Sequence, residues 1–345
     1  MIMLNTLKRD FQRYERGDGA LEEGQEETGW KLVHGDVFRP PVMAGWLTVM
    51  VGTGVQLGIS LLFLISFACF GFLSPANRGV LMQSMLFLFV FMGTFGGFTS
   101  ARLFRMFKGT RWRSNGLWTA LLFPGITFAI FFTLNLFIWG QKSSGAVPFG
   151  TLFALLLMWL GISVPLVLCG AFFGYRKQPV EHPVRTNQIP RQVPAQPWFV
   201  NTVMSVIVGG VLPFGAVFVE MFYILSSIWM HQFYYLFGFV ALVLVILFLT
   251  CCEVTVVLTY FQLCCEDYNW WWRSFLTGGA SAMYVFVYSL YYAWAKLEMA
   301  RAVAGIVYCG YMFIASFAIF LVCGSLSFLT TLVFVRTIYA AIKID

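Results

Sequence analysis

Eight long apolar segments, separated by polar connections, occupy the chain from residue 46 to residue 335. Each is close to or above the ~20 residues that cross a bilayer as a helix. Hydrophobic residues make up 59% of the chain and charged residues only 11%, which excludes a soluble globular domain. We therefore predict an all-α fold, a polytopic membrane helix bundle with eight transmembrane helices. The predicted spans are 46–72, 79–104, 116–139, 149–173, 199–228, 233–263, 275–295 and 301–335.

Basic residues mark one side of the membrane. Of the 22 Lys and Arg residues, all lie in alternate connections beginning with the N-terminal segment, except Arg78, Lys142, Lys296 and Arg301. Because positively charged connections stay in the cytosol, this bias places both termini there. The net charge of +7 therefore reads as a topology determinant, and we expect no nucleic-acid partner. The predicted organisation is a cytosolic juxtamembrane segment (1–45), a transmembrane domain (46–335) and a cytosolic tail (336–345).

Two cytosolic connections have unusual compositions. The hairpin 264–274 contains EDYNWWWR, and tryptophan concentrates at membrane–water interfaces. An anchoring belt is one interpretation, but adjacent side chains on a helix point about 100° apart, so at least one tryptophan should pack on a neighbouring element. The loop 174–198 is rich in proline and holds His182, a candidate proton site or a solvated residue. The hairpin residues of interest are Glu266, Asp267, Trp270, Trp271, Trp272 and Arg273.

Two acids lie inside predicted spans. Glu220 and Glu253 each need a partner or a water-filled cavity, because an ionisable group in hydrocarbon is costly. Their predicted depths differ by roughly 18 Å, at 1.5 Å per residue, so we do not expect them to pair with each other. They indicate either a transport path or two protonated, hydrogen-bonded acids.

Small residues recur along the first two spans. Gly54 and Gly58 have the spacing that allows two helices to approach closely. The approaching helix is either another span of this chain or a glycine-rich span of another protein. The glycines concerned are Gly52, Gly54, Gly58, Gly93, Gly96 and Gly97.

The reactive residue types form no recognisable site. The eight cysteines show no CxxC and no spacing with histidine that would hold a metal. Cys264 and Cys265, at the predicted cytosolic interface, are candidates for palmitoylation or chance neighbours in a cysteine-containing span. We find no nucleophile–base pair and no phosphate loop, so we expect no cofactor and no enzyme.

Several distinctive stretches run from residue 29 to the C-terminus. They are GWKLVHGDVFRPP (29–41), GTGVQL (52–57), NLFIWG (135–140), VPFGT (147–151), EHPVRTNQIPRQ (181–192), LPFG (212–215), YFQLCCEDYNWWWRSF (260–275) and KID (343–345). In these stretches the chain resembles the nonaspanins, the transmembrane nine superfamily. EHPVRTNQIPRQ and EDYNWWWRSF are highly specific, and the resemblance covers most of the chain.

The resemblance implies an organisation and a role. Nonaspanins have nine spans and a large luminal N-terminal domain, whereas this sequence begins like the exit from the family's first span. We therefore expect a truncated form that lacks the luminal domain and the first span. The family's Golgi and endosomal location implies the same location here, and its sorting of membrane proteins with glycine-rich spans implies such cargo. The family's C-terminal K-x-D/E signal, which engages the COPI coat, matches Lys343 and Asp345.

Two function hypotheses follow. The first is a cargo-sorting membrane protein, with membrane lipids, cargo spans and the COPI coat as partners. The second is a transporter or channel whose path is lined by Glu220 and Glu253. A polar cavity that reaches either glutamate would favour transport, and a dry, tightly packed bundle with a membrane-facing groove would favour sorting.

Overall fold

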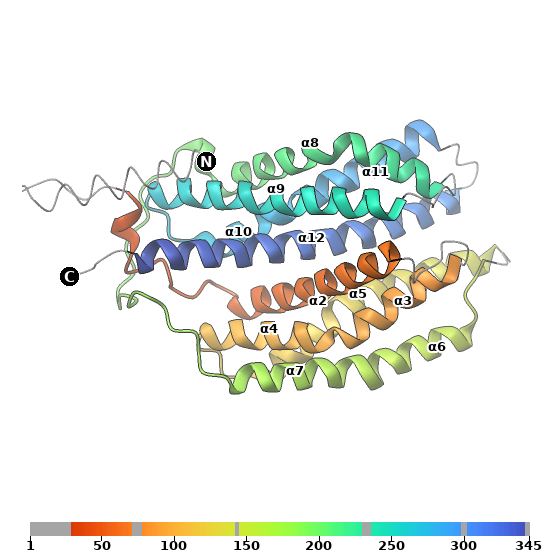
Figure 1. Ribbon diagram of the computed structural model, residues 1–345, viewed down its shortest axis with the longest axis horizontal. Helices are drawn as coiled ribbons and strands as arrows, with labels where there is room; N and C mark the ends of the chain where they lie inside the picture. The colour runs from red at the N-terminus through yellow and green to blue at the C-terminus, as the bar shows by residue number, and fades with distance from the viewer. Residues whose placement is uncertain (1–28, 71–77, 142–144, 230–235, 298–301, 342–345) are drawn as a thin grey trace, which may run out of the picture.

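The computed structural model describes residues 29–70, 78–141, 145–229, 236–297 and 302–341 (Figure 1). Within these ranges the chain forms helices and loops without a strand, in agreement with the all-α prediction. The α-helices are α2 (Ala44–Cys69), α3 (Arg78–Phe91), α4 (Gly93–Met106), α5 (Trp112–Gly140), α6 (Phe149–Met158), α7 (Val164–Arg176), α8 (Thr202–Trp229), α9 (Leu236–Cys264), α10 (Trp270–Gly279), α11 (Ser281–Lys296) and α12 (Ala302–Ala340). Short 3-10 helices lie at Trp30–Val33 and Trp198–Val200, and a π-helical turn at Trp159–Ser163 joins α6 to α7.

Six of the described helical stretches are long and apolar enough to cross a membrane. A seventh span results if α3 and α4 are counted together despite the 40° bend between them. The predicted number of eight is therefore not confirmed. The remaining predicted span, 275–295, falls on α10 and α11, which have 10 and 16 residues and are separated at Ala280. Neither helix alone reaches the ~20 residues that a span requires.

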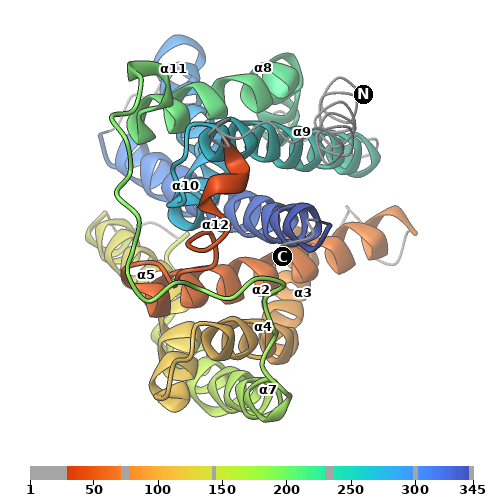
Figure 2. The ribbon, with the colours of Figure 1, turned by 90° about the vertical axis from the view of Figure 1, so that its left-hand side faces the viewer.

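Helices α2 and α12 lie side by side in the centre of the bundle (Figure 2). On one side α4 packs on α2 and α7 packs on α4; on the other, α9 and α10 pack on α12, and α8 packs on α9. Of the 18-residue apolar stretch that could span the membrane, 56% is buried inside the protein in both α2 and α12. The corresponding share is 17–28% in the other four spanning stretches. The central pair is therefore the core, and the outer helices leave most of their apolar surface for lipid.

Five of the six predicted packing glycines touch other helices of this chain. A Cβ at Gly54 would overlap the Leu321 carbonyl oxygen of α12, so the missing side chain lets the two central helices meet. At Gly58 the nearest atom stands 3.5 Å from an added Cβ, which leaves ordinary contact distance. The close contacts of the others are between Gly52 and Gly96, and from Gly93 and Gly97 to Val167 of α7. These five glycines are internal packing positions.

Helix α12 has 39 residues and is therefore about 58 Å long, well beyond the ~30 Å of a hydrocarbon core. Its last turns continue past the span, where the Tyr339 hydroxyl donates a hydrogen bond to the Trp30 carbonyl (2.7 Å). The first and last described segments thus meet at one end of the bundle, the left end in Figure 1. The connections between α4 and α5, α7 and α8, and α9 and α10 lie at this end too.

Candidate functional site

Three segments far apart in the sequence meet at this end. We call them the strap (29–42), the loop (177–197) and the hairpin (265–275), and their assembly the cap. They contain two of the stretches on which the family resemblance rests and most of a third, YFQLCCEDYNWWWRSF.

The three consecutive tryptophans of the hairpin hold the strap. Each indole N–H donates to a different backbone carbonyl, at 2.7–2.9 Å. The backbone hydrogen bonds within the strap do not use these three carbonyls, and a carbonyl left unpaired is costly where it is buried. The bonds run from Trp270 to Val37, from Trp271 to Arg39 and from Trp272 to Val42.

The anchoring-belt interpretation is wrong for two of the three. Trp270 and Trp271 are 0% and 2% exposed, and their rings stack at 4.0 Å against each other. Trp271 also makes an edge contact with Phe107, at the end of α4. Trp272 remains partly exposed. The hairpin therefore uses its tryptophans as a clamp inside the protein.

Polar residues give the hairpin its shape. Glu266 has φ of 60°, the left-handed conformation that commonly ends a helix, and it terminates α9. Asp267 then accepts hydrogen bonds from the Asn269 backbone N–H (3.0 Å) and the Gln262 amide (2.8 Å). Arg273 is 5% exposed, lies 3.6 Å from the Asp267 carboxylate and donates to the hydroxyl of Ser205 on α8. This buried pair fixes α10 relative to both the turn and α8.

The strap and the loop are joined by backbone and charge. The Asn187 N–H donates to the Gly35 carbonyl (2.8 Å), and Arg39 donates to the Asn187 carbonyl (2.9 Å). Asp36 pairs with Arg39 at 2.5 Å and accepts the backbone N–H of Arg191 (3.2 Å). Asp36 is only 2% exposed, and the hydrogen bonds from Arg39 and the Arg191 N–H offset the cost of burying its carboxylate away from water.

The loop also contacts the hairpin. Arg191 forms an ion pair with Glu266 (3.0 Å), and the Gln196 amide donates to the Cys265 carbonyl (3.0 Å). Each of the three segments therefore contacts the other two. The cap therefore joins the ends of α2, α9, α10 and α12 to one another. Among the described residues, no group of three or more His, Cys, Asp or Glu could hold a metal ion.

His182 lies in the cap beside α12. Its ring stacks on Phe38 with centroids 4.5 Å apart. Burial, assisted by the positive charges of Arg336 and Lys108, lowers the pKa of His182 to about 4. Arg336 also donates to the carbonyl of Glu181 (3.0 Å). The histidine is therefore neutral at physiological pH and acts as an aromatic packing residue.

The two intramembrane glutamates stay apart. No described hydrogen bond or ion pair joins Glu220 on α8 to Glu253 on α9. Glu220 is partly buried, whereas Glu253 lies on the exposed face of α9 with Leu242, Val245 and Leu249.

Other predicted site residues are placed as follows. Cys264 is the last residue of α9 and Cys265 the first residue of the hairpin. Both are partly buried, and their palmitoylation stays a prediction. Lys343 and Asp345 lie outside the described residues.

The strap, Asp36 and Arg191 were not predicted as site residues. The only signal for them was their place in the distinctive stretches, because a single sequence does not show which distant polar residues pair.

Comparison with known proteins gives the family. The sequence model of the family described as Endomembrane protein 70 matches residues 1–302. Transmembrane 9 superfamily member 9 of Arabidopsis thaliana is 59% identical over the whole chain, and this chain covers 53% of it. Member 4 of Homo sapiens is 51% identical over the whole chain, with 54% of that protein covered, and member 2 of Rattus norvegicus is 50% identical, with 52% covered.

The chain spans about half the length of the curated relatives it matches. No solved structure matches it. The family match covers most of the chain, and the similarity to the relatives extends over its full length. The chain belongs to the Endomembrane protein 70 family, whose members here are transmembrane 9 superfamily proteins.

Proposed function

We propose that this membrane protein binds and sorts other membrane proteins in the Golgi and endosomes, particularly those with glycine-rich spans. The family description, an endomembrane protein, supports an internal-membrane location. The observation that favours binding of another span is the exposed position of Glu253 within the apolar helix α9.

Glu253 lies 11 residues before the end of α9, about 16 Å from the cap end at 1.5 Å per residue. That depth is near the middle of a ~30 Å hydrocarbon core. Its side chain is exposed on the outward face of α9, and within the described residues no hydrogen bond or ion pair reaches it. A carboxyl at this depth is stabilised when another helix supplies its partner. A glycine-rich span suits this place, because it brings its backbone carbonyls close enough to accept from the acid.

Photo-crosslinking in membranes tests this proposal. A crosslinker replaces Leu249, one turn from Glu253, or Leu136 on the exposed face of α5 as the matched control. The target is a single-span reporter whose span is either glycine-rich or has leucine at those positions. We expect crosslinks from position 249 to the glycine-rich reporter, loss with Glu253→Leu and retention with Glu253→Gln. Equal crosslinking from both positions to both reporters would overturn the proposal.

The topology is part of the proposal. We propose that α10 and α11 cross the membrane together as an eighth span, since Trp270 lies in the cap and Lys296 ends the run about 40 Å away at 1.5 Å per residue. The cap end carries most of the positive charge, so we assign it to the cytosol. Single cysteines at positions 5, 187 and 345 should then all react with a reagent added from the cytosolic side, and labelling from opposite sides would contradict this topology.

The retention signal completes the proposal. Lys343 and Asp345 would follow the cytosolic end of α12 and offer a coat one cation beside two carboxylates, the side chain and the C-terminus. Transport through the bundle is the weaker alternative. The groove between α8 and α11 includes neither Glu220 nor Glu253 in its lining. If Glu220→Gln alone abolished a measured ion flux, transport would replace sorting as the better explanation.

A further inference from the structure

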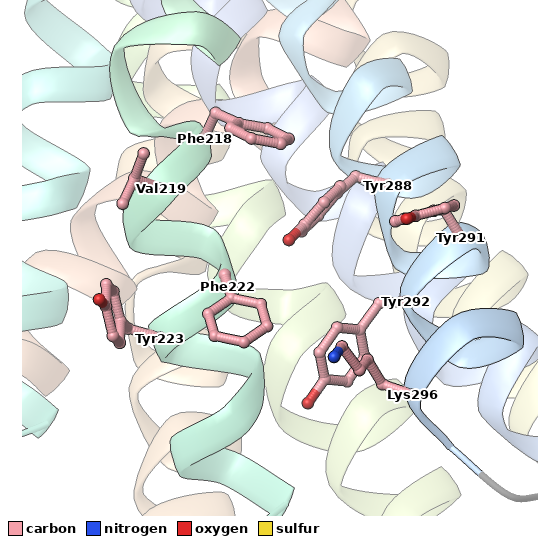
Figure 3. Close-up of a pocket in the computed structure, with 8 residues that line it drawn as sticks. All are labelled: Phe218, Val219, Phe222, Tyr223, Tyr288, Tyr291, Tyr292 and Lys296. Carbon is pink, nitrogen blue, oxygen red and sulfur yellow. The ribbon is translucent and has the colours of Figure 1, made fainter.

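A groove separates α8 from α11 in the half of the bundle away from the cap (Figure 3). Its volume is about 350 Å³, within the roughly 300–1,000 Å³ of typical small-molecule sites. The residues that line it are Phe218, Val219, Phe222 and Tyr223 of α8 and Tyr288, Tyr291, Tyr292 and Lys296 of α11.

Aromatic rings form the inner wall of this groove. Phe218 contacts Tyr288 with ring centroids 5.1 Å apart, and Phe222 contacts Tyr292 at 6.1 Å. In Figure 3 these rings project from the two helices toward each other. Tyr292 is only 7% exposed, and its hydroxyl lies 3.4 Å from the Ser226 hydroxyl, which joins the two helices at the base.

The outer rim is open to the bilayer. Val219, Tyr223 and Tyr291 are 57–58% exposed, and all three face outward from the helix pair. An apolar, aromatic-lined groove that opens sideways on a spanning helix is accessible to a hydrocarbon chain and costly for water to fill. The occupant that fits is therefore a lipid chain.

A single cation stands at the end of the groove. Lys296 is the last residue of α11, at the membrane surface opposite the cap, and it lines the groove together with Tyr292. No described carboxylate lies within ion-pair distance of it. An ammonium that has no carboxylate partner among the described residues, at headgroup level and next to a groove for a chain, complements a lipid with net negative charge.

We propose that the groove between α8 and α11 is a binding site for an anionic glycerophospholipid. One acyl chain lies along the Phe218, Phe222 and Tyr288 rings, and the headgroup phosphate contacts the Lys296 ammonium. The site is separate from the α9 face proposed for cargo.

Photoactivatable lipids test the site with the full chain in nanodiscs. Phosphatidylserine and phosphatidylcholine probes carry the same diazirine on one acyl chain, and the labelled peptides of α8 and α11 are quantified. Lys296 lies on the side opposite the cap, which is the non-cytosolic side in the topology proposed above, so both probes are incorporated symmetrically into the two leaflets. We expect phosphatidylserine to label the peptides about fivefold more than phosphatidylcholine, the factor that corresponds to about 1 kcal/mol of attraction per lysine. Lys296→Gln should abolish this preference and Lys296→Arg should keep it. Lys177→Gln, at the cap end, is the matched control and should change nothing.

A steric variant separates the chain from the headgroup. Val219→Trp adds bulk at the outer rim of the groove without altering charge, so it should reduce labelling by both probes in α8 and α11. A thermal unfolding midpoint equal to the parent's shows that each variant is folded. Equal labelling by the two lipids in the parent chain, or a preference that survives Lys296→Gln, would overturn the proposal. Labelling unchanged by Val219→Trp would place the chain elsewhere and would also overturn it.

Discussion

Replacing Trp270 by Phe should loosen the cap far more than the same change at Trp272. Both substitutions remove one indole N–H and keep an aromatic ring. At position 270 the hydrogen bond to the Val37 carbonyl is buried. Without the indole N–H this carbonyl would have no donor, because water cannot reach it. An unsatisfied buried group costs about 1–3 kcal/mol, and the smaller ring leaves a cavity that adds to this cost. At position 272 the bond to Val42 is exposed, and water takes over the carbonyl, so the cost is at most about 1 kcal/mol.

Hydrogen exchange of strap peptides measures this difference. Because 1.4 kcal/mol is a factor of ten in an equilibrium constant, Trp270→Phe should speed exchange in the strap by roughly 10- to 100-fold. Trp272→Phe should change it by about fivefold or less. Peptides from the C-terminal half of α5, which runs away from the cap end, serve as the internal reference. Equal effects of the two substitutions, or no effect of Trp270→Phe, would refute the clamp.

Three further predictions concern the bundle, the cap and the tail. Gly54→Ala should destabilise the protein by about 1–3 kcal/mol, because the new methyl group overlaps the Leu321 carbonyl, whereas Gly58→Ala should be near neutral in the same thermal unfolding assay. The folded pKa of His182, about 4, is below its unfolded value of about 6.5, so its contribution to stability is present at pH 7 and is lost as pH falls from about 6.5 to 4. Discounted for solvent screening, the loss is about 1 kcal/mol. The protection of the strap amides, corrected for the intrinsic exchange rate at each pH, should fall accordingly between pH 7 and pH 5 in the parent but not in His182→Phe. If the proposed retention signal is correct, Lys343→Ser, or one residue added after Asp345, should move the protein from the Golgi to later compartments. Imaging measures the location, and coat binding to a tail peptide measures the contact. Unchanged location together with unchanged coat binding would rule out the signal.

Long apolar runs made the helices predictable. The prediction 116–139 corresponds to α5 at Trp112–Gly140, and 233–263 corresponds to α9 at Leu236–Cys264. Such runs are detected from composition alone because a span must satisfy its own backbone and present apolar side chains. The excess length of the last segment was also predicted, and α12 continues into the cap.

Breaks within apolar runs escaped prediction. The bend between α3 and α4 and the break at Ala280 leave hydropathy unchanged. Gly278 and Gly279 precede the break, and added Cβ atoms there would overlap Ser327 and Phe320 of α12. The local path of α10 is therefore set by packing against a helix that comes later in the chain.

The cap could be predicted only in part. The three tryptophans were recognised as a special hairpin, and spacing on a helix required one of them to pack inward. Their partners are backbone carbonyls more than 200 residues earlier, and a backbone carbonyl carries no sequence signal. The ion pair of Arg191 with Glu266 likewise joins residues whose proximity depends on the assembled bundle.

A disulfide between the strap and the loop tests the central claim, that distant segments form one cap. The side chain of Asn187 occupies the space beside Gly35, so cysteines at both positions are close enough to bond. The pair is placed in a chain whose eight native cysteines are replaced, with a protease site inserted after α5. Gly35→Cys with Lys177→Cys, at the far end of the same loop, is the control. We predict that, after oxidation in membranes and cleavage, the two fragments stay joined for the 35/187 pair and separate for the control; separation of both pairs, or equal joining, would contradict the cap.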